Sequence, residues 1–291
     1  MQAATRRVCS PAVIRRAYDA LLLDLDGTLV DPEDRVHPRT RAALSAAVER
    51  GVRVRIATGR SELATIPVLE DLGLSEPAVV FNGAGVWCPL RREFLEERVL
   101  SDRTLERAVD YGLARGLLTV TMGSGRKHAV QPRREAEALA LSEMTGLHYV
   151  EPADLLGRRT IRVTVFSDEH SSSQQLADDV ERAIDAPVYL THFPLHVLPN
   201  HRESRMLVVD VHPPCRGKGE ALRLLAEEHG IAPERVVAVG DASNDVPMLA
   251  AAGLGVAVEG SMREALEVAD RVIGPPETDA LGALVEELFL G

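Results

Sequence analysis

The chain has 291 residues, a length that suits one large domain or two modest ones. Hydrophobic residues make up 45% of it and charged residues 26%, so it can bury a core, and its formal net charge of −11 disfavours a nucleic acid as partner. Its cysteines lie far apart and its apolar runs fall short of the ~18 residues that span a bilayer, which disfavours a disulfide framework, a zinc site and a membrane segment and suits a cytoplasmic protein.

Residues 21–30, LLLDLDGTLV, begin with an apolar run that is typical of a strand buried on both faces. Asp24 and Asp26 follow where the run stops, at the end of the strand where open α/β sheets bind ligands. Alternate residues of a strand face the same way, so the two carboxylates would lie close and both stay ionised only beside a cation. This segment predicts a metal-assisted site built on carboxylates.

Strands and helices then alternate along the chain in three stretches. The first predicts a helix over 38–50, a strand over 52–57, a helix over 62–72, a strand over 78–81 and a hairpin over 86–99. The second predicts a helix over 102–115, a strand over 117–122, a helix over 133–145, a strand over 160–166, a helix over 173–184 and a strand over 188–191. The third predicts a helix over 219–229, a strand over 235–239, a helix over 244–252, strands over 254–258 and 271–273, and a helix over 281–289.

The middle stretch has the character of a separate α+β unit, inserted rather than appended, because βα alternation resumes after it. We therefore expect the α/β fold class: a Rossmann-like parallel sheet core flanked by helices, with an inserted α/β (α+β) domain. The expected divisions are an N-terminal extension over 1–18, a core formed by 19–98 and 206–291, and the inserted domain over 99–205.

Two further segments place polar groups at helix starts. Thr58-Gly59-Arg60 offers a hydroxyl and free backbone N–H groups, which hold phosphate, although threonine is also an ordinary N-cap. Lys218 opens another helix within Arg-Gly-Lys-Gly-Glu. Lys127 and Lys218 are the only lysines among 33 basic residues, which indicates a need for a compact ammonium there rather than a solvated surface charge.

A fourth segment, Asp241-Ala-Ser-Asn244-Asp245, follows another strand, and a helix cap alone does not explain three acid or amide side chains within five positions. Asn82 and Gly83 also end a strand and face the same cleft. Lys127 belongs to a glycine-rich stretch that is similar to an anion-binding loop, for which a polar turn between strands is the alternative.

Taken together, these segments resemble the haloacid dehalogenase-like hydrolase superfamily, through DxDGT at one strand end and GDxxND at another. The resemblance extends over nearly the whole chain from about residue 20. The place of the inserted domain, with Phe-Asn82-Gly83-Ala84 before it, is similar to the Cof-type branch (subfamily IIB), whose inserted domain is a large α/β cap. Near the C-terminus, Asp279-Ala280-Leu281 departs from the Asp-Gly-Val that is usual in this family.

The resemblance implies an Mg²⁺-dependent phosphatase that works through an aspartyl-phosphate. Asp24 would be the nucleophile and Asp26 the general acid and base, with Thr58 and Lys218 completing the catalytic set. The residues expected to bind phosphate or substrate are Thr58, Gly59, Arg60, Asn82, Gly83, Lys127, Lys218 and Asn244. The residues expected to bind the metal are Asp24, Asp26 through its backbone carbonyl, Asp241 and Asp245.

The predicted reaction is hydrolysis of a small phosphorylated metabolite, with a sugar phosphate favoured. Phosphoryl transfer to an organic acceptor, as in phosphomannomutase-like enzymes of the same superfamily, stays open because both reactions use an aspartyl-phosphate and a cap. A signalling receiver is disfavoured because no aspartate follows the strand over 52–57, and a silent binding protein because no acid is missing. The sequence indicates neither the physiological substrate nor the oligomeric state.

Overall fold

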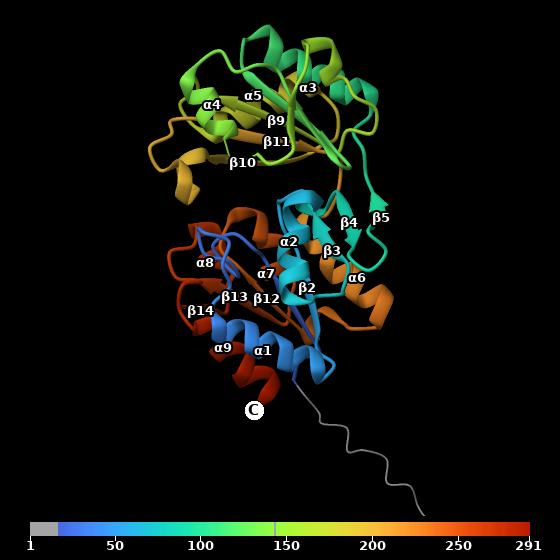
Figure 1. The fold of residues 1–291 in the computed structure, drawn as a ribbon, viewed down its shortest axis with the longest axis vertical. Helices are drawn as coiled ribbons and strands as arrows, with labels where there is room; N and C mark the ends of the chain where they lie inside the picture. The colour runs from blue at the N-terminus through green and yellow to red at the C-terminus, as the bar shows by residue number, and fades with distance from the viewer. Residues whose placement is uncertain (1–16, 143) are drawn as a thin grey trace, which may run out of the picture.

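The computed structural model describes residues 17–142 and 144–291, so nearly all of the predicted N-terminal extension lies outside the described residues. Two lobes lie one above the other along the long axis of the molecule, and the chain crosses between them twice (Figure 1). The lower lobe contains both the early and the late parts of the chain, and the upper lobe contains the middle. Among the described residues, no helix is both long enough and apolar enough to cross a membrane.

The lower lobe, called the core below, is organised around a parallel sheet in the order β14-β13-β12-β1-β2. Its strands are β1 (Ala20–Leu23), β2 (Arg53–Ile56), β12 (Val236–Gly240), β13 (Leu254–Val258) and β14 (Arg271–Ile273). β1 lies between β12 and β2, and all four of its side chains are buried. Burial on both faces explains why its sequence is a continuous apolar run rather than an alternating one.

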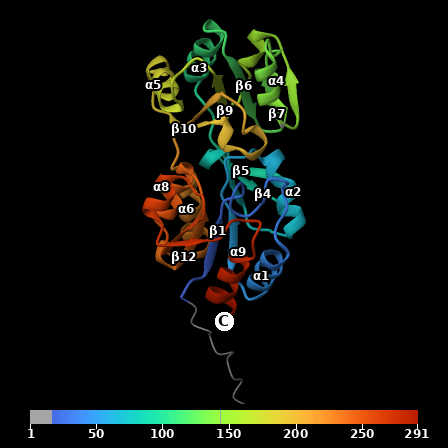
Figure 2. The same ribbon diagram turned by 90° about the vertical axis from the view of Figure 1, so that its left-hand side faces the viewer.

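Helices cover both faces of this sheet (Figure 2). They are α1 (Pro38–Glu49), α2 (Glu62–Leu72), α6 (Glu220–His229), α7 (Val246–Leu249), α8 (Arg263–Val268) and α9 (Ala280–Val285). α1 and α9 pack with Leu21 and Leu23 in one hydrophobic cluster, and α6 and α7 pack with Ala20 and Leu22 in another. The helix predicted over 62–72 is confirmed as α2, which ends because Gly73 adopts the left-handed conformation.

A small antiparallel sheet adjoins β2 in the core. Its strands are β3 (Ala78–Val80), β4 (Gly85–Cys88) and β5 (Glu93–Glu97), in the order β3-β4-β5. β4 and β5 confirm the hairpin predicted over 86–99. The rings of Trp87 and Phe94 meet edge to face across it, with centroids 5.2 Å apart.

The upper lobe, called the cap below, contains a six-stranded sheet in the order β10-β11-β9-β6-β7-β8. Its strands are β6 (Leu118–Gly123), β7 (Arg126–Ala129), β8 (Leu147–Tyr149), β9 (Arg162–Ser167), β10 (Tyr189–Pro194) and β11 (Leu207–His212). The helices α3 (Asp102–Ala114) and α5 (Ser173–Ile184) pack on one face with a hydrophobic core of their own. The other face is turned toward the core (Figure 1). A parallel core sheet with an inserted second sheet confirms the predicted fold class.

The cap also holds the main differences from the sequence-based expectations. β7, β8 and β11 were not predicted, and the helix expected over 133–145 is shorter, α4 (Glu135–Leu141). β11 lies in the stretch 206–291 that we assigned to the core, yet it pairs with β9 and β10. In β11 the buried Val209 and Val211 alternate with Asp210 and His212, which is typical of a strand with one polar face. We therefore propose that the cap extends to His212.

The loop after β3 and the turn before α6 touch closely. Gly83 has φ +94°, and a Cβ at this position would overlap the carbonyl oxygen of Gly217. We expect Gly83→Ala to lower the free energy of unfolding by about 2–3 kcal/mol, since strain and overlap add. Urea unfolding measures this. Gly51→Ala is the matched control, because Gly51 has φ +79° with nothing within 4 Å of an added Cβ. Equal losses in the two variants would contradict the close contact.

Candidate active site

β1 carries Asp24 to the carboxyl edge of the core sheet, where Lys218 meets it. Lys218 lies in the short 3-10 turn Gly217–Gly219 before α6, and its Nζ is 2.6 Å from Oδ1 of Asp24 and 2.6 Å from Oδ1 of Asp245. All three side chains are buried. Lys218 is therefore an interior ammonium and not a solvated surface lysine.

The charges of this cluster do not balance. Burial and the neighbouring Asp245 raise the pKa of Asp24 well above its usual value, and Lys218 opposes that rise. Burial and Asp245 also raise the pKa of Asp241, to about 7. Burial alone would lower the pKa of Lys218, but Asp24 and Asp245 raise it above its usual value. One ammonium among three carboxylates leaves the cluster short of positive charge.

The three carboxylates converge closely enough to share a cation. Ligand oxygens of Asp24, Asp241 and Asp245 all lie within 4.8 Å of one another. Oδ2 of Asp245 is fixed by the backbone N–H groups of Asp241 and Ala242, at 3.0 and 2.9 Å. Carboxylate oxygens are the ligands that hard divalent cations such as Mg²⁺ prefer. The donor set and its shortage of positive charge both fit a divalent metal at this position.

Gly27 explains why a glycine follows the paired aspartates. Its φ is +73°, and a Cβ there would stand 2.6 Å from Oδ2 of Asp241. Only a residue without a side chain lets the backbone turn past that carboxylate. The next residue, Thr28, donates its hydroxyl to Oδ1 of Asp241 at 3.4 Å. The DxDGT and GDxxND segments are thus in direct contact.

Thr58 follows β2, the strand beside β1, and is fully buried. Its Oγ1 accepts a hydrogen bond from the backbone N–H of Arg60 at 3.1 Å. This is the local capping contact that threonine often makes, and it leaves the hydroxyl hydrogen free to be donated elsewhere. Both interpretations of this segment, a cap and a phosphate-binding hydroxyl, are therefore compatible.

Asn82 lies between the loop that carries Gly59, the segment that carries Asn244, and the cap. It adopts a left-handed conformation, φ 51° and ψ 40°, at the end of β3. Its Oδ1 accepts from Nδ2 of Asn244 at 3.0 Å, and its Nδ2 donates to Oγ1 of Thr191 on β10 at 3.3 Å. The structure thus brings Asn82 and Asn244 together beside Gly59, whose Cβ position lies 3.1 Å from Oδ1 of Asn82.

Asp26 and Arg60, predicted as the acid–base and as a phosphate-binding residue, are paired with each other instead of turning into the acidic cluster. The guanidinium of Arg60 donates to both carboxylate oxygens of Asp26, with a closest distance of 2.5 Å. It also donates to Asp34 at 2.5 Å. The side chain of Asp26 is half exposed. In this arrangement the guanidinium of Arg60 is engaged by two carboxylates and its backbone N–H by Thr58, so the predicted contact of Arg60 with a phosphate stays a prediction.

A family model described as haloacid dehalogenase-like hydrolase matches residues 21–284. The chain belongs to this family. Its fold agrees, because the chain superposes on the structure of a sugar phosphatase of subclass IIB with a TM-score of 0.76, at 21% identity, over 92% of this chain and 98% of the other.

Two curated relatives of this haloacid dehalogenase-like (HAD) hydrolase are phosphatases of small metabolites. One is 5-amino-6-(5-phospho-D-ribitylamino)uracil phosphatase of Bacillus subtilis, 25% identical, covering 93% of this chain and 98% of the relative. The other is pyridoxal phosphate phosphatase of Escherichia coli, 28% identical, covering 91% and 96%. The chain is accordingly an HAD-type hydrolase, and these two relatives act on phosphorylated small molecules.

The cap of this HAD hydrolase contributes side chains that sequence reasoning found only in part. Lys127 on β7 is buried, and its contact with a substrate stays a prediction. Burial lowers its pKa, and Glu62 at the start of α2 opposes that effect. Oε1 of Glu62 also accepts from the backbone N–H of Gly125 at 2.6 Å, and Nη1 of Arg162 donates to the carbonyl oxygen of Gly59 at 2.9 Å. The cap therefore rests on the loop that carries Thr58.

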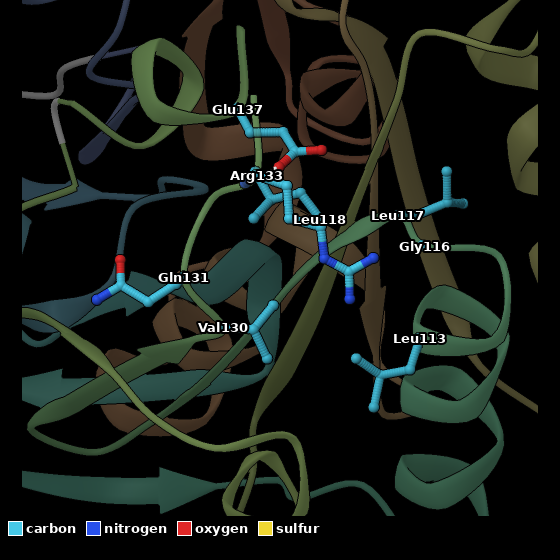
Figure 3. Close-up of a pocket in the computed structure, with 8 residues that line it drawn as sticks. All are labelled: Leu113, Gly116, Leu117, Leu118, Val130, Gln131, Arg133 and Glu137. Atoms are coloured by element: carbon cyan, nitrogen blue, oxygen red, sulfur yellow. Dashed lines mark hydrogen bonds between the residues drawn. The ribbon is translucent and has the colours of Figure 1, made fainter. Parts of the chain in front are cut away.

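Nothing near Arg162, Tyr189 and His212 in the chain resembles a motif, so these residues were missed. Glu62 lies two residues after Arg60, but an acid is ordinary in the first turn of a helix and gave no separate signal. The alternation of Arg162 and Thr164 with valines was a usable signal, since it predicts polar side chains along one face of β9. A pocket of about 10 Å³ between α3 and the edge of the cap sheet, lined by Leu113, Val130 and Arg133, holds about one water at most and contains none of the predicted site residues (Figure 3).

Proposed function

We propose that this HAD hydrolase is an Mg²⁺-dependent phosphatase that releases phosphate from a small phosphorylated metabolite, with a sugar phosphate as the favoured class, through an aspartyl-phosphate. The observation that carries the proposal is the buried Asp24 with Lys218 at 2.6 Å and two further carboxylates within 4.8 Å. A cytoplasmic location, suggested by the cysteine usage, stays a prediction.

In the proposed reaction Oδ of Asp24 attacks phosphorus, and the bond from phosphorus to the leaving oxygen breaks. Asp26 protonates that oxygen and then takes a proton from the water that attacks the aspartyl-phosphate. The second attack breaks the bond between phosphorus and Asp24 and releases phosphate. Lys218 stabilises the charge on the transferring group, and Thr58 donates its free hydroxyl hydrogen to it.

Asp24, Asp241 and Asp245 would hold the Mg²⁺, together with the backbone carbonyl of Asp26. When bound, the ion supplies positive charge that offsets the repulsion between the carboxylates and the phosphate. Arg60 holds Asp26 at the edge of the site through its guanidinium, so we infer that this pair opens when Asp26 exchanges protons with the substrate.

Metal binding should depend on pH through Asp241. Because the pKa of this carboxyl is raised to about 7, protons compete with the metal below that pH. We expect the apparent Kd for Mg²⁺ to be steady above about pH 8 and to rise nearly tenfold for each unit below about pH 6. Calorimetric titration with Mg²⁺ between pH 5.5 and 8.5 measures this. An affinity that does not change over the range would contradict the assignment of Asp241 as a ligand.

Phosphate release from a panel of sugar phosphates, nucleotides, pyridoxal phosphate and flavin mononucleotide, with Mg²⁺ and with chelator, tests the function. We expect metal-dependent release, strongest for sugar phosphates. Phosphate release that is equally fast with Mg²⁺ and with chelator would overturn the proposed chemistry. Silence across the panel, combined with phosphate exchange that requires a bisphosphorylated sugar, would favour the phosphomannomutase-like transferase.

A further inference from the structure

Six polar side chains on β9, β10 and β11 lie on the face of the cap sheet that is turned toward the core. They are called the cap-face cluster below. Its members are Arg162, Thr164, Tyr189, Thr191, Asp210 and His212. Tyr189 pairs with His212 across the sheet, and Asp210 pairs with both Thr191 and Thr164. Positions two apart on a strand share a face, so the six side chains project together.

The cap-face cluster lies directly over the loops that carry the catalytic residues. Arg162 donates to the loop after β2, and Thr191 accepts from Asn82 at the end of β3. The hydroxyl of Tyr189 stands 2.5 Å from the place where a Cβ on Gly217 would lie, one residue before the catalytic lysine. A phosphate held at the core would therefore present the rest of its molecule to this face.

His212 lies on β11, the middle of the three strands that carry the cluster, and its ring makes no hydrogen bond to any residue that the structure describes. It is fully buried, and neither ring nitrogen has a partner among the described residues. Burial and the nearby Arg162 lower its pKa well below the usual value, so the ring is neutral and offers one donor and one acceptor. Nε of Arg162 also lacks a partner there. Such groups are costly to leave unpaired, which favours a ligand that supplies both a donor and an acceptor.

The charges around the cluster cancel. Nη1 of Arg162 lies 3.5 Å from Oδ2 of Asp210. Burial and the nearby Arg162 lower the pKa of Lys127, and Glu62 opposes them. Two cations thus face two carboxylates, with no surplus positive charge. A second phosphate or carboxylate on the substrate would lose its water here without gaining a free cation. Hydroxyl groups would instead find the donors and acceptors that they need.

We propose that His212 is a specificity-determining residue, which with Tyr189 and Arg162 hydrogen-bonds an uncharged, hydroxyl-bearing leaving group, and that the cap gives no site to a second anionic group. The inference rests on the proposed function, because a leaving group exists only if Asp24 takes up the phosphoryl group. It assigns singly phosphorylated polyols as the preferred substrates and disfavours the transferase, which requires a bisphosphorylated sugar.

The test compares kcat/KM for glucitol 6-phosphate with kcat/KM for p-nitrophenyl phosphate, whose leaving group has no hydroxyl beyond the reacting oxygen. In His212→Leu the ratio of the two should fall about tenfold or more, the equivalent of one or two hydrogen bonds. In His212→Gln, which keeps a donor and an acceptor, the fall should be smaller. In Tyr189→Phe the ratio should fall several-fold. This variant tests the same inference if His212→Leu does not fold.

His128→Leu is the matched control, since His128 follows Lys127 on β7 and its side chain points to the opposite face of the sheet. Its ratio should equal that of the wild type. Asp210→Asn leaves Arg162 unbalanced and should raise kcat/KM for fructose 1,6-bisphosphate relative to glucitol 6-phosphate about fivefold or more.

Two results would overturn this inference alone, provided that p-nitrophenyl phosphate is still hydrolysed. One is a wild-type enzyme that prefers fructose 1,6-bisphosphate to glucitol 6-phosphate. The other is a ratio of kcat/KM for glucitol 6-phosphate to that for p-nitrophenyl phosphate that is the same in His212→Leu and in the wild type. Wild-type protein that releases no metal-dependent phosphate from p-nitrophenyl phosphate would instead overturn the proposed function. The two failures are therefore distinguishable in one set of assays.

Discussion

Asp24→Asn is expected to lower kcat by about 10⁴-fold or more, because an amide does not form the covalent intermediate on which the proposed reaction depends. The phosphate should still bind, since Thr58 and Lys218 are untouched. Rapid-mixing measurement of phosphate release under saturating substrate separates the loss of chemistry from any loss of binding. Phosphorus NMR of acid-quenched wild-type enzyme should show an acyl phosphate that the variant lacks.

Asp279→Asn is the matched control for this substitution, because Asp279 is an exposed aspartate that pairs with Arg39 and is not one of the predicted site residues. Its kcat should stay within about twofold of the wild type, as a surface charge contributes little. Thermal unfolding should show that both variants are folded. Substantial turnover by folded Asp24→Asn would remove Asp24 from the role of nucleophile.

Lys218→Met should have the largest effect on stability. It leaves Asp24 and Asp245 as buried carboxylates without their cation, and loss of one partner of a buried ion pair costs about 3–5 kcal/mol. Urea unfolding of the metal-free protein at pH 7 measures the loss. Loss of the ammonium should also abolish most activity, because charge on the transferring phosphoryl group is no longer offset.

The stability deficit of Lys218→Met should shrink as the pH falls. The pKa of Asp24 is already raised in the folded protein, and removal of the ammonium raises it further. A carboxyl with a raised folded-state pKa destabilises the fold where it is ionised, and that penalty disappears as pH falls toward the unfolded-state value of about 4. Urea midpoints at pH 5 and pH 8 test the sign. A deficit that grows on acidification would contradict the buried-carboxylate explanation.

Lys127→Met provides the comparison, since Lys127 is the other lysine of the chain. Burial lowers the pKa of Lys127, whereas the net effect on Lys218 is a raised pKa. The positive charge of Lys127 therefore destabilises the fold, and that of Lys218 stabilises it. We expect the substitution to leave the unfolding midpoint nearly unchanged or slightly raised. A large loss in both variants would show that stem packing, rather than charge, dominates at these lysines.

The predicted site residues that lie together in the structure are mostly those that follow a strand end. Asp24 and Asp241 come directly after apolar strands, and Thr58 follows two residues after the end of β2. Parallel strands bring their carboxyl ends to one edge of a sheet whatever the rest of the chain does. Lys218 was found through composition, because lysine is so rare in this chain. In each case the signal was local, and the fold class alone brought the residues together.

The cap residues were harder because their roles depend on register. Whether Arg162 or Val163 faces the core is decided by how β9 pairs with β6 and β11, and a shift of one residue would exchange them. β8 has only three residues and no alternation to detect. The pairing of Arg60 with Asp34 was not predicted for a different reason, since Asp34 lies in a loop whose path no local pattern indicates.

The two faces of the cap sheet divide the work of this lobe. α3 and α5 pack with one face around Leu176, Val163 and Val211, and the polar cluster occupies the opposite face. If the inner face recognises the leaving group as we propose, substitutions there change the substrate while the hydrophobic core of the lobe is left unchanged. This separation makes the lobe an adaptable module: a lineage can acquire a new substrate by exchanging a few inward side chains while its catalytic machinery is inherited intact.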